Sequence, residues 1–142
     1  MKKIIMISVL SISISFGVYA QKLDASKVPS AVKASFAKQY PGVTAKWEKE
    51  DGKYEAGFTK NGASMSVLID EKGMIAETEM DIKVADLPAT AAAYVKEHYK
   101  GKTIKETAKI THANGTINYE VNVNGKDVIF DANGKFLEET KE

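Results

Sequence analysis

The stretch KYEAGFTKNGASMSVLIDEKG, residues 53–73, decides the fold of this chain. Tyr54, Ala56 and Phe58 alternate with charged or small residues, which is the period-two pattern of a strand with one buried face. Asn61-Gly62 follows, a pair that favours a type I′ turn because both central residues of that turn need a positive φ. A second alternating apolar run comes after the turn. The stretch therefore predicts a β-hairpin with one apolar face.

The same order of features returns about sixty residues later in INYEVNVNGKDVIFDANG, residues 117–134. A Tyr-Glu pair, an Asn-Gly turn and an Asp-x-x-Gly turn occur in both stretches. Upstream of each stretch, Val28-Pro29 aligns with Leu87-Pro88, and Tyr40-Pro41-Gly42 aligns with Tyr99-Lys100-Gly101. We interpret residues 21–82 and 83–142 as two tandem units of one design, with residues 81–86 as the linker.

Each unit is predicted to open with a helix. Pro29 and Pro88 suit a first helical turn, where a missing N–H costs nothing. Gly42 and Gly101 are typical of the residue at which a helix ends. Apolar residues three and four apart form one stripe on each helix. The sequence that follows each helix predicts four strands: near residues 45–50, 54–59, 65–69 and 74–80 in the first unit, and near residues 104–111, 117–123, 128–131 and 136–140 in the second. The expected fold is α+β, two tandem helix-plus-four-strand repeats with antiparallel strands, in which one helix covers one sheet face and leaves the other open.

The first twenty residues have the pattern of a signal peptide. Met1-Lys2-Lys3 is positive, residues 4–18 are mostly apolar, and Val18-Tyr19-Ala20 offers small residues for cleavage before Gln21. The alternative is an uncleaved anchor, but the run is shorter than the roughly 20 residues of a spanning helix and contains four serines. We expect a periplasmic or secreted protein without stable membrane insertion after cleavage, and the absence of Cys means that no disulfide is needed.

Charge disfavours a nucleic-acid partner. Without Lys2 and Lys3, eighteen lysines face nineteen acidic residues, so the formal charge changes from +1 to −1. Both signs are spread evenly, with nine lysines and ten acids in residues 21–82 and nine of each in residues 83–142. No basic field attracts a polyanion, and the chain has no Arg to hold phosphate in a bidentate manner.

Catalytic and metal motifs are absent from the sequence. There is no Cys and no Gly-x-Ser-x-Gly elbow, and His98 and His112 lack the spacing of zinc ligands. We interpret both as surface or capping histidines. Asp131-Ala132-Asn133-Gly134 invites a calcium interpretation, but Lys135 stands where an EF-hand loop needs a ligand, and a tight turn explains the pattern equally well. We expect no metal and no cofactor.

The candidate partner-binding residues are Trp47, Glu55, Lys46, Lys105 and Glu120. Glu55 and Glu120 follow Tyr at matching places, so each points away from the core if its Tyr points inward. The simpler interpretation is a strand kept soluble by alternating charge. Trp47 is either an exposed partner anchor or a partly buried core residue, because its counterpart at the same spacing is Glu106.

The chain resembles the PepSY-like, beta-lactamase-inhibitor-like family of exported proteins found largely in Bacteroidetes. The resemblance covers about residues 23–140 and implies two helix-plus-four-strand units with both helices on one side of an antiparallel sheet, like the tandem domains of the beta-lactamase inhibitor protein. It implies no catalytic residues, and it suggests enzyme inhibition only by analogy. The motifs that carry it recur from Leu87-Pro88 onward; in the first unit they are Val28-Pro29, Tyr40-Pro41-Gly42, Trp47-Glu48, Tyr54-Glu55-Ala56, Asn61-Gly62 and Ile69-Asp70 with Gly73.

Three hypotheses for function follow. The first is a non-enzymatic exported module that holds a protein or peptide of the cell envelope on the open sheet face, in the manner of an inhibitor. The second is a binder of a small molecule or an envelope polymer in the cleft between the units. The third is a hydrolase that uses Glu55, Glu120 or His112.

Overall fold

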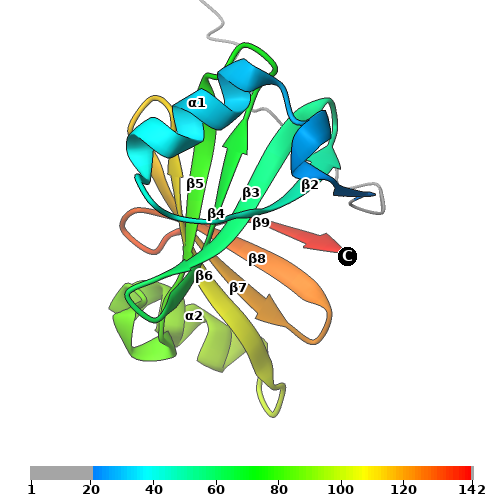
Figure 1. Ribbon diagram of the computed structural model, residues 1–142. Coiled ribbons are helices and arrows are strands. Elements are labelled where there is room, and N and C mark those ends of the chain that lie inside the picture. Colours follow the sequence, from blue (N-terminus) through cyan, green and yellow to red (C-terminus); the bar gives the residue numbers. More distant parts are fainter. Residues whose placement is uncertain (1–20, 142) are drawn as a thin grey trace, which may run out of the picture.

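The structure, a computed structural model, describes residues 21–141. The predicted signal peptide, residues 1–20, lies outside the described residues. The described part contains nine strands, two α-helices and two short 3₁₀ helices (Figure 1). In chain order these are β1 Gln21–Leu23, η1 Ala25–Lys27, α1 Ser30–Gln39, β2 Lys46–Glu50, β3 Lys53–Lys60, β4 Ala63–Ile69, β5 Ile75–Asp81, η2 Val84–Asp86, α2 Ala89–His98, β6 Ile104–His112, β7 Ile117–Val123, β8 Lys126–Asp131 and β9 Phe136–Lys141.

The nine strands form one antiparallel sheet whose spatial order is the chain order from β1 to β9. Strands β2 to β9 lie where the sequence predicts them, to within about two residues at each end. β5 pairs with β6, so the strands that follow α1 and those that follow α2 share one sheet. β1 is not among the predicted strands, because three residues with one apolar side chain show no alternation; it pairs with β2 through Leu23 opposite Trp47.

The first part of the core lies between α1 and strands β2–β4. Val32 and Phe36 of the helix are buried against the alternating side chains of β3 and β4. The Phe36 ring meets Trp47 at 5.5 Å and Phe58 at 5.2 Å between centroids, in edge-to-face arrangements that aromatic rings favour. The apolar alternation of residues 54–58 therefore faces a helix, as predicted.

The second part of the core lies between α2 and strands β7 and β8. Ala91 and Val95 of α2 are buried in one cluster with Val121, Val128 and Phe130. Fully buried valine and phenylalanine side chains, such as Val121, Val128 and Phe130, each stabilise the fold by about 1.5–3 kcal/mol relative to exposure. Each α-helix of the described chain thus has its own apolar contact with the sheet.

Two Asp-x-x-Gly turns lie directly beneath the helix starts. In the second of them the Asp131 carboxylate accepts hydrogen bonds from the backbone N–H groups of Asn133 (2.8 Å) and Lys135 (2.9 Å). Gly134 has φ +79°, and a Cβ added there would lie 2.8 Å from the backbone nitrogen of Ala91. The turn interpretation of this segment accounts for both the Asp and the Gly, and Asp70 with Gly73 repeats the arrangement beneath α1.

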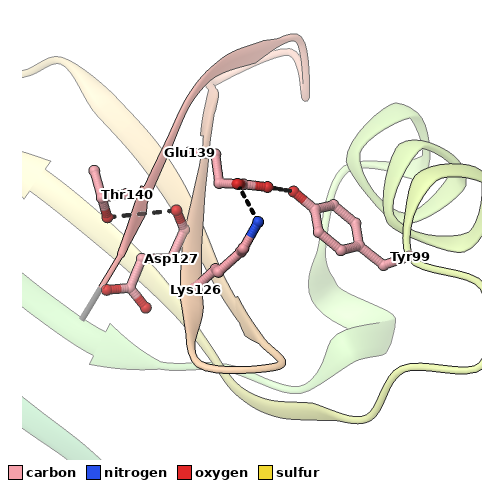
Figure 2. A network of polar contacts seen from close by, with 5 residues as sticks. All are labelled: Tyr99, Lys126, Asp127, Glu139 and Thr140. Atoms are coloured by element: carbon pink, nitrogen blue, oxygen red, sulfur yellow. Dashed lines mark hydrogen bonds and ion pairs between the residues drawn. The ribbon is translucent and has the colours of Figure 1, made fainter.

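The end of α2 is tied to the last two strands by a polar network (Figure 2). The Tyr99 hydroxyl donates to the Glu139 carboxylate, whose other oxygen accepts from the Lys126 ammonium at 2.6 Å. Burial and this hydrogen bond raise the pKa of Tyr99 well above its ordinary value. The network anchors β9, which is an edge strand of the sheet, to both β8 and α2.

Candidate functional site

The face of β3–β5 that points away from α1 is hollowed into a cavity of about 610 Å³. This volume lies within the range of pockets that hold ligands in proteins. Because Tyr54, Ala56 and Phe58 point toward α1, the side chains between them point to the opposite side. We call this opposite side the open face. Small residues border the cavity where β3 pairs with β4, with Gly57 opposite Ser66.

Carboxylates surround these small residues. They come from four strands that are widely spaced in the sequence, whereas the cavity lining contains a single cation, Lys46 of β2. The lining carboxylates are Glu48 on β2, Glu55 on β3, Glu79 and Asp81 on β5, and Glu106 on β6. We call these five residues the acidic rim. The arrangement produces a one-sided negative potential over a concave surface.

Glu79 shows the effect of this crowding most clearly. It occupies a middle strand of the sheet, opposite Ser66 on β4 and Ile110 on β6. Burial, followed by the nearby charges of Glu55 and other acidic residues, raises the pKa of Glu79 to about 7. The same two causes raise the pKa of Glu50 at the end of β2. The open face therefore holds more negative charge at neutral pH than it can accommodate without cost.

This geometry can now be set beside that of known proteins. A family model described as "Putative beta-lactamase-inhibitor-like, PepSY-like" matches residues 18–77 and 52–138. The chain belongs to the PepSY-like family. The family description refers to inhibitors and names no enzymatic reaction. No curated protein matches the chain.

Solved structures share the fold of this PepSY-like protein. A BLIP-like protein from Bacteroides fragilis is 26% identical with a TM-score of 0.66, over 79% of this chain and 85% of that one. A protein from Bacteroides eggerthii, described as a putative periplasmic protein, is 16% identical with a TM-score of 0.74, over 80% and 88%. A protein from Bacteroides ovatus, described as a member of the DUF2874 family, is 20% identical with a TM-score of 0.70, over 78% and 85%. In residues 21–141 of the PepSY-like protein, neither α-helix has the length and apolar character required to span a bilayer.

The predicted partner-binding residues fall in different places. Glu55 and Lys46 line the open-face cavity together. Trp47 is only 8% exposed and packs on Phe36, so of its two interpretations the structure has the core residue and not the exposed partner anchor: its ring belongs to the core beneath α1. Lys105 lies at a bulge in β6 and borders a second, smaller cavity of about 430 Å³.

The two matched glutamates are far apart on the sheet of the PepSY-like protein. Glu55 lies on β3 and Glu120 on β7, four strand steps away, which is about 19 Å along the sheet at the usual strand spacing. Carboxylate pairs that cleave glycosidic bonds are at most about 9.5 Å apart. These residues therefore do not form an acid–base pair.

His112 serves as a link across the sheet. Its Nδ1 lies 3.3 Å from the Glu77 carboxylate on β5, and its Nε2 lies 2.6 Å from the side-chain oxygen of Asn118 on β7. The Asn118 amide donates in turn to the carbonyl of Phe130.

His98 contacts its own helix: its ring stacks on Tyr94, and its Nδ1 lies 2.9 Å from the Tyr94 carbonyl oxygen. In residues 21–141 no three His, Asp or Glu side chains are grouped so that they could hold a metal ion.

Four of the five acidic-rim residues were not among the predicted site residues. Glu79, Asp81 and Glu106 come from strands that become neighbours only when β5 pairs with β6. A local signal was present in β5, IAETEMD, where acidic residues occupy every second position. That alternation identifies a charged strand face, but it does not identify which other strands contribute to the same face.

Proposed function

We propose that this protein is an exported, non-enzymatic binding module that holds a protein or peptide partner on its open face, in the manner of an enzyme inhibitor. The observation that carries the proposal is the hollowed, uncovered side of a sheet whose other side is packed on α1. Faces of this kind provide a broad, rigid surface for a partner. The inhibitor-like description of the family and the periplasmic description of a structural neighbour agree with it.

A duplicated architecture is part of the proposal: two helix-plus-four-strand units with both helices on one face of the sheet. Directly paired residues share a sheet face. One unbroken row of pairs runs from Met65 to Met80, Lys109, Tyr119 and Phe130. Met65 packs on the cluster beneath α1 and Phe130 belongs to the cluster beneath α2, which supports a common helix-bearing side and a continuous open face on the reverse.

The absence of a catalytic arrangement supports a binding role. Glu55 and Glu120 are too far apart to cooperate, and His112 is engaged by Glu77 and Asn118. A hydrolase needs an activated nucleophile or water beside a positioned base. In residues 21–141, Glu55 and Glu120 therefore do not act as a pair, and His112 is held between two neighbouring strands.

The test uses a variant that fills the cavity without changing its charge. The backbone of Gly57 has an ordinary conformation, and a Cβ there would meet only the Lys46 carbonyl oxygen, at 3.9 Å. Gly57→Phe should therefore fold and place a ring in the cavity. Ala34→Phe adds the same ring to the exposed side of α1 and is the matched control.

The purified proteins are immobilised and exposed to envelope extract of the source bacterium, and bound proteins are quantified. Wild type and Ala34→Phe should retain the same stoichiometric partner, and Gly57→Phe should lose it. Equal retention by all three proteins would show that the open face does not bind the partner.

A second candidate, a small-molecule or polymer binder, is favoured by the smaller cavity between the η2 segment and the start of β6. Its lining includes Lys83, Lys105 and Thr107. A specific ligand at a hundred times its Kd stabilises the protein by about 2.7 kcal/mol, so a thermal-shift screen of glycans and metabolites tests this candidate. A ligand whose effect disappears in Lys105→Ala would support it, and a screen without any shift would reject it.

A further inference from the structure

We propose that the occupant of the open-face cavity is a basic segment of a partner protein, which inserts a lysine or arginine side chain between Glu55, Glu79 and Glu106. This inference rests on the proposed function and specifies the chemistry of the partner. Shape and charge lead to it separately.

Shape favours a long side chain that enters from above. Where β3 meets β4, the cavity lining includes small residues, Gly57 opposite Ser66 and Ser64 further along β4, beside the larger pair of Phe58 and Met65. The longer carboxylate side chains of the acidic rim border this area from β2, β5 and β6. A long, narrow side chain with a polar end fits a cavity of this form better than a flat apolar surface of a partner does.

The charge of the cavity lining determines which terminal group the inserted side chain should carry. The cavity lining has five carboxylates and one cation, Lys46. The ion pairs of His112 with Glu77 and of Lys126 with Glu139 include no acidic-rim residue. An anionic tip would be repelled, and a neutral one would desolvate carboxylates without compensation.

A cationic terminal group also removes the electrostatic repulsion among carboxylates, which costs the unbound protein free energy. The groups that act on Glu79 are Glu55 from β3, Glu77 and Asp81 from β5, and Glu106 from β6, and all of them are acidic. An ammonium or guanidinium placed among these groups converts repulsion into attraction and supplies charge-assisted hydrogen bonds. The binding free energy then includes relief of repulsion as well as new contacts.

The first test measures binding of a fluorescent peptide of alternating lysine and threonine by anisotropy. A peptide with glutamine in place of lysine is the control ligand. The variant is Glu55→Gln with Glu106→Gln, and the matched control is Glu71→Gln with Glu97→Gln, which removes the same charge from an exposed turn and from α2. We expect binding to the wild type and the control variant, about tenfold weaker binding to the acidic-rim variant, and a fall in affinity with added salt.

The second test detects the proton on Glu79. Calorimetric titration with the same peptide at pH 7, in two buffers of different ionisation enthalpy, gives the number of protons released. A carboxyl with a pKa of about 7 is half protonated at that pH, so a neighbouring cation should release about half a proton. Glu79→Gln should bind the peptide without this release.

Three results would overturn the inference: equal affinity for the lysine and glutamine peptides, equal losses in the acidic-rim and control variants, or tighter binding of spermine or Ca²⁺ than of the peptide. The proposed function fails separately. If Gly57→Phe loses the envelope partner while the acidic-rim variant keeps it, the open face binds a partner that is not basic. If neither variant loses it, the proposed function is wrong as well.

Discussion

Replacing Glu79 by glutamine should stabilise the protein at alkaline pH and leave it unchanged at acidic pH. The cause is the position of this carboxyl on β5, where burial and the negative charges of Glu55, Asp81, Glu106 and Glu77 raise its pKa from 4.5 to about 7. Glutamine has the same shape and cannot ionise. The substitution therefore removes the repulsion without removing volume.

The sign and size of the effect follow from linkage. Below pH 4.5 the Glu79 carboxyl is protonated in both the folded and the unfolded chain, and its ionisation costs nothing. Between pH 4.5 and about 7 the unfolded chain loses this proton first, so the free energy of unfolding falls as the pH rises and then levels off. A shift of this size corresponds to about 3 kcal/mol, reduced to about 2 kcal/mol because part of the side chain contacts water.

Trp47 provides the assay. It is the only tryptophan and is 8% exposed, so its fluorescence reports unfolding. Urea titrations at pH 4 and pH 8 should give equal unfolding free energies for wild type and Glu79→Gln at the lower pH. At the higher pH the variant should be more stable by about 2 kcal/mol.

The control is Glu71→Gln in the exposed turn between β4 and β5. It should leave the difference between the two pH values as it is in the wild type. Glu50, whose pKa is also raised, adds to the pH dependence of every protein compared and cancels in the differences. A Glu79→Gln variant that is destabilised at pH 8, or equally stabilised at both pH values, would refute the explanation.

Three further substitutions test the packing. Gly134→Ala should destabilise the fold by about 2 kcal/mol in urea titrations, because φ is +79° and the new Cβ would lie 2.8 Å from the Ala91 nitrogen; an unchanged midpoint would contradict the close approach of this turn to α2. Trp47→Ala should cost about 4 kcal/mol, followed by circular dichroism, whereas an exposed anchor would cost almost nothing. Tyr99→Phe should cost about 1 kcal/mol, and the same loss should disappear in a Glu139→Gln background if the Tyr99–Glu139 bond is its cause.

The elements of the fold were predictable because their signals are local. The alternation of Tyr54, Ala56 and Phe58 identifies β3 and its inward face, and Asn61 with φ +52° adopts the turn that Asn-Gly predicts. The pairing of β5 with β6 has no such signal. It joins strands separated by α2, and neither strand indicates its neighbour across that interval.

The face of Trp47 was undecided for a specific reason. The residue spacing between the two units matches Trp47 with Glu106, and a charged residue at that place predicts a side chain that points to solvent. Strand pairing gives a different counterpart: Trp47 lies opposite the buried Ala56, and Thr107 lies opposite the buried Val121. The bulge between Ile104 and Glu106 shifts the register by one residue, and a one-residue shift exchanges the two faces of a strand.

The near-zero formal charge of the chain does not indicate that one face of the sheet is acidic. A formal charge near zero excludes recruitment of a polyanion by a protein-wide field, and an even spread of lysines along the chain supports that conclusion. It says nothing about a single face, because alternation in strands sends neighbouring residues to opposite sides. Lys109 pairs with Met80 and Tyr119 in the row that joins the two clusters beneath the helices, whereas Glu79 and Asp81, on either side of Met80, line the open-face cavity. A segment that docks on that face experiences the local charge of the acidic rim rather than the average of the chain, so near-neutrality of the whole protein is compatible with strong selectivity for a cationic partner.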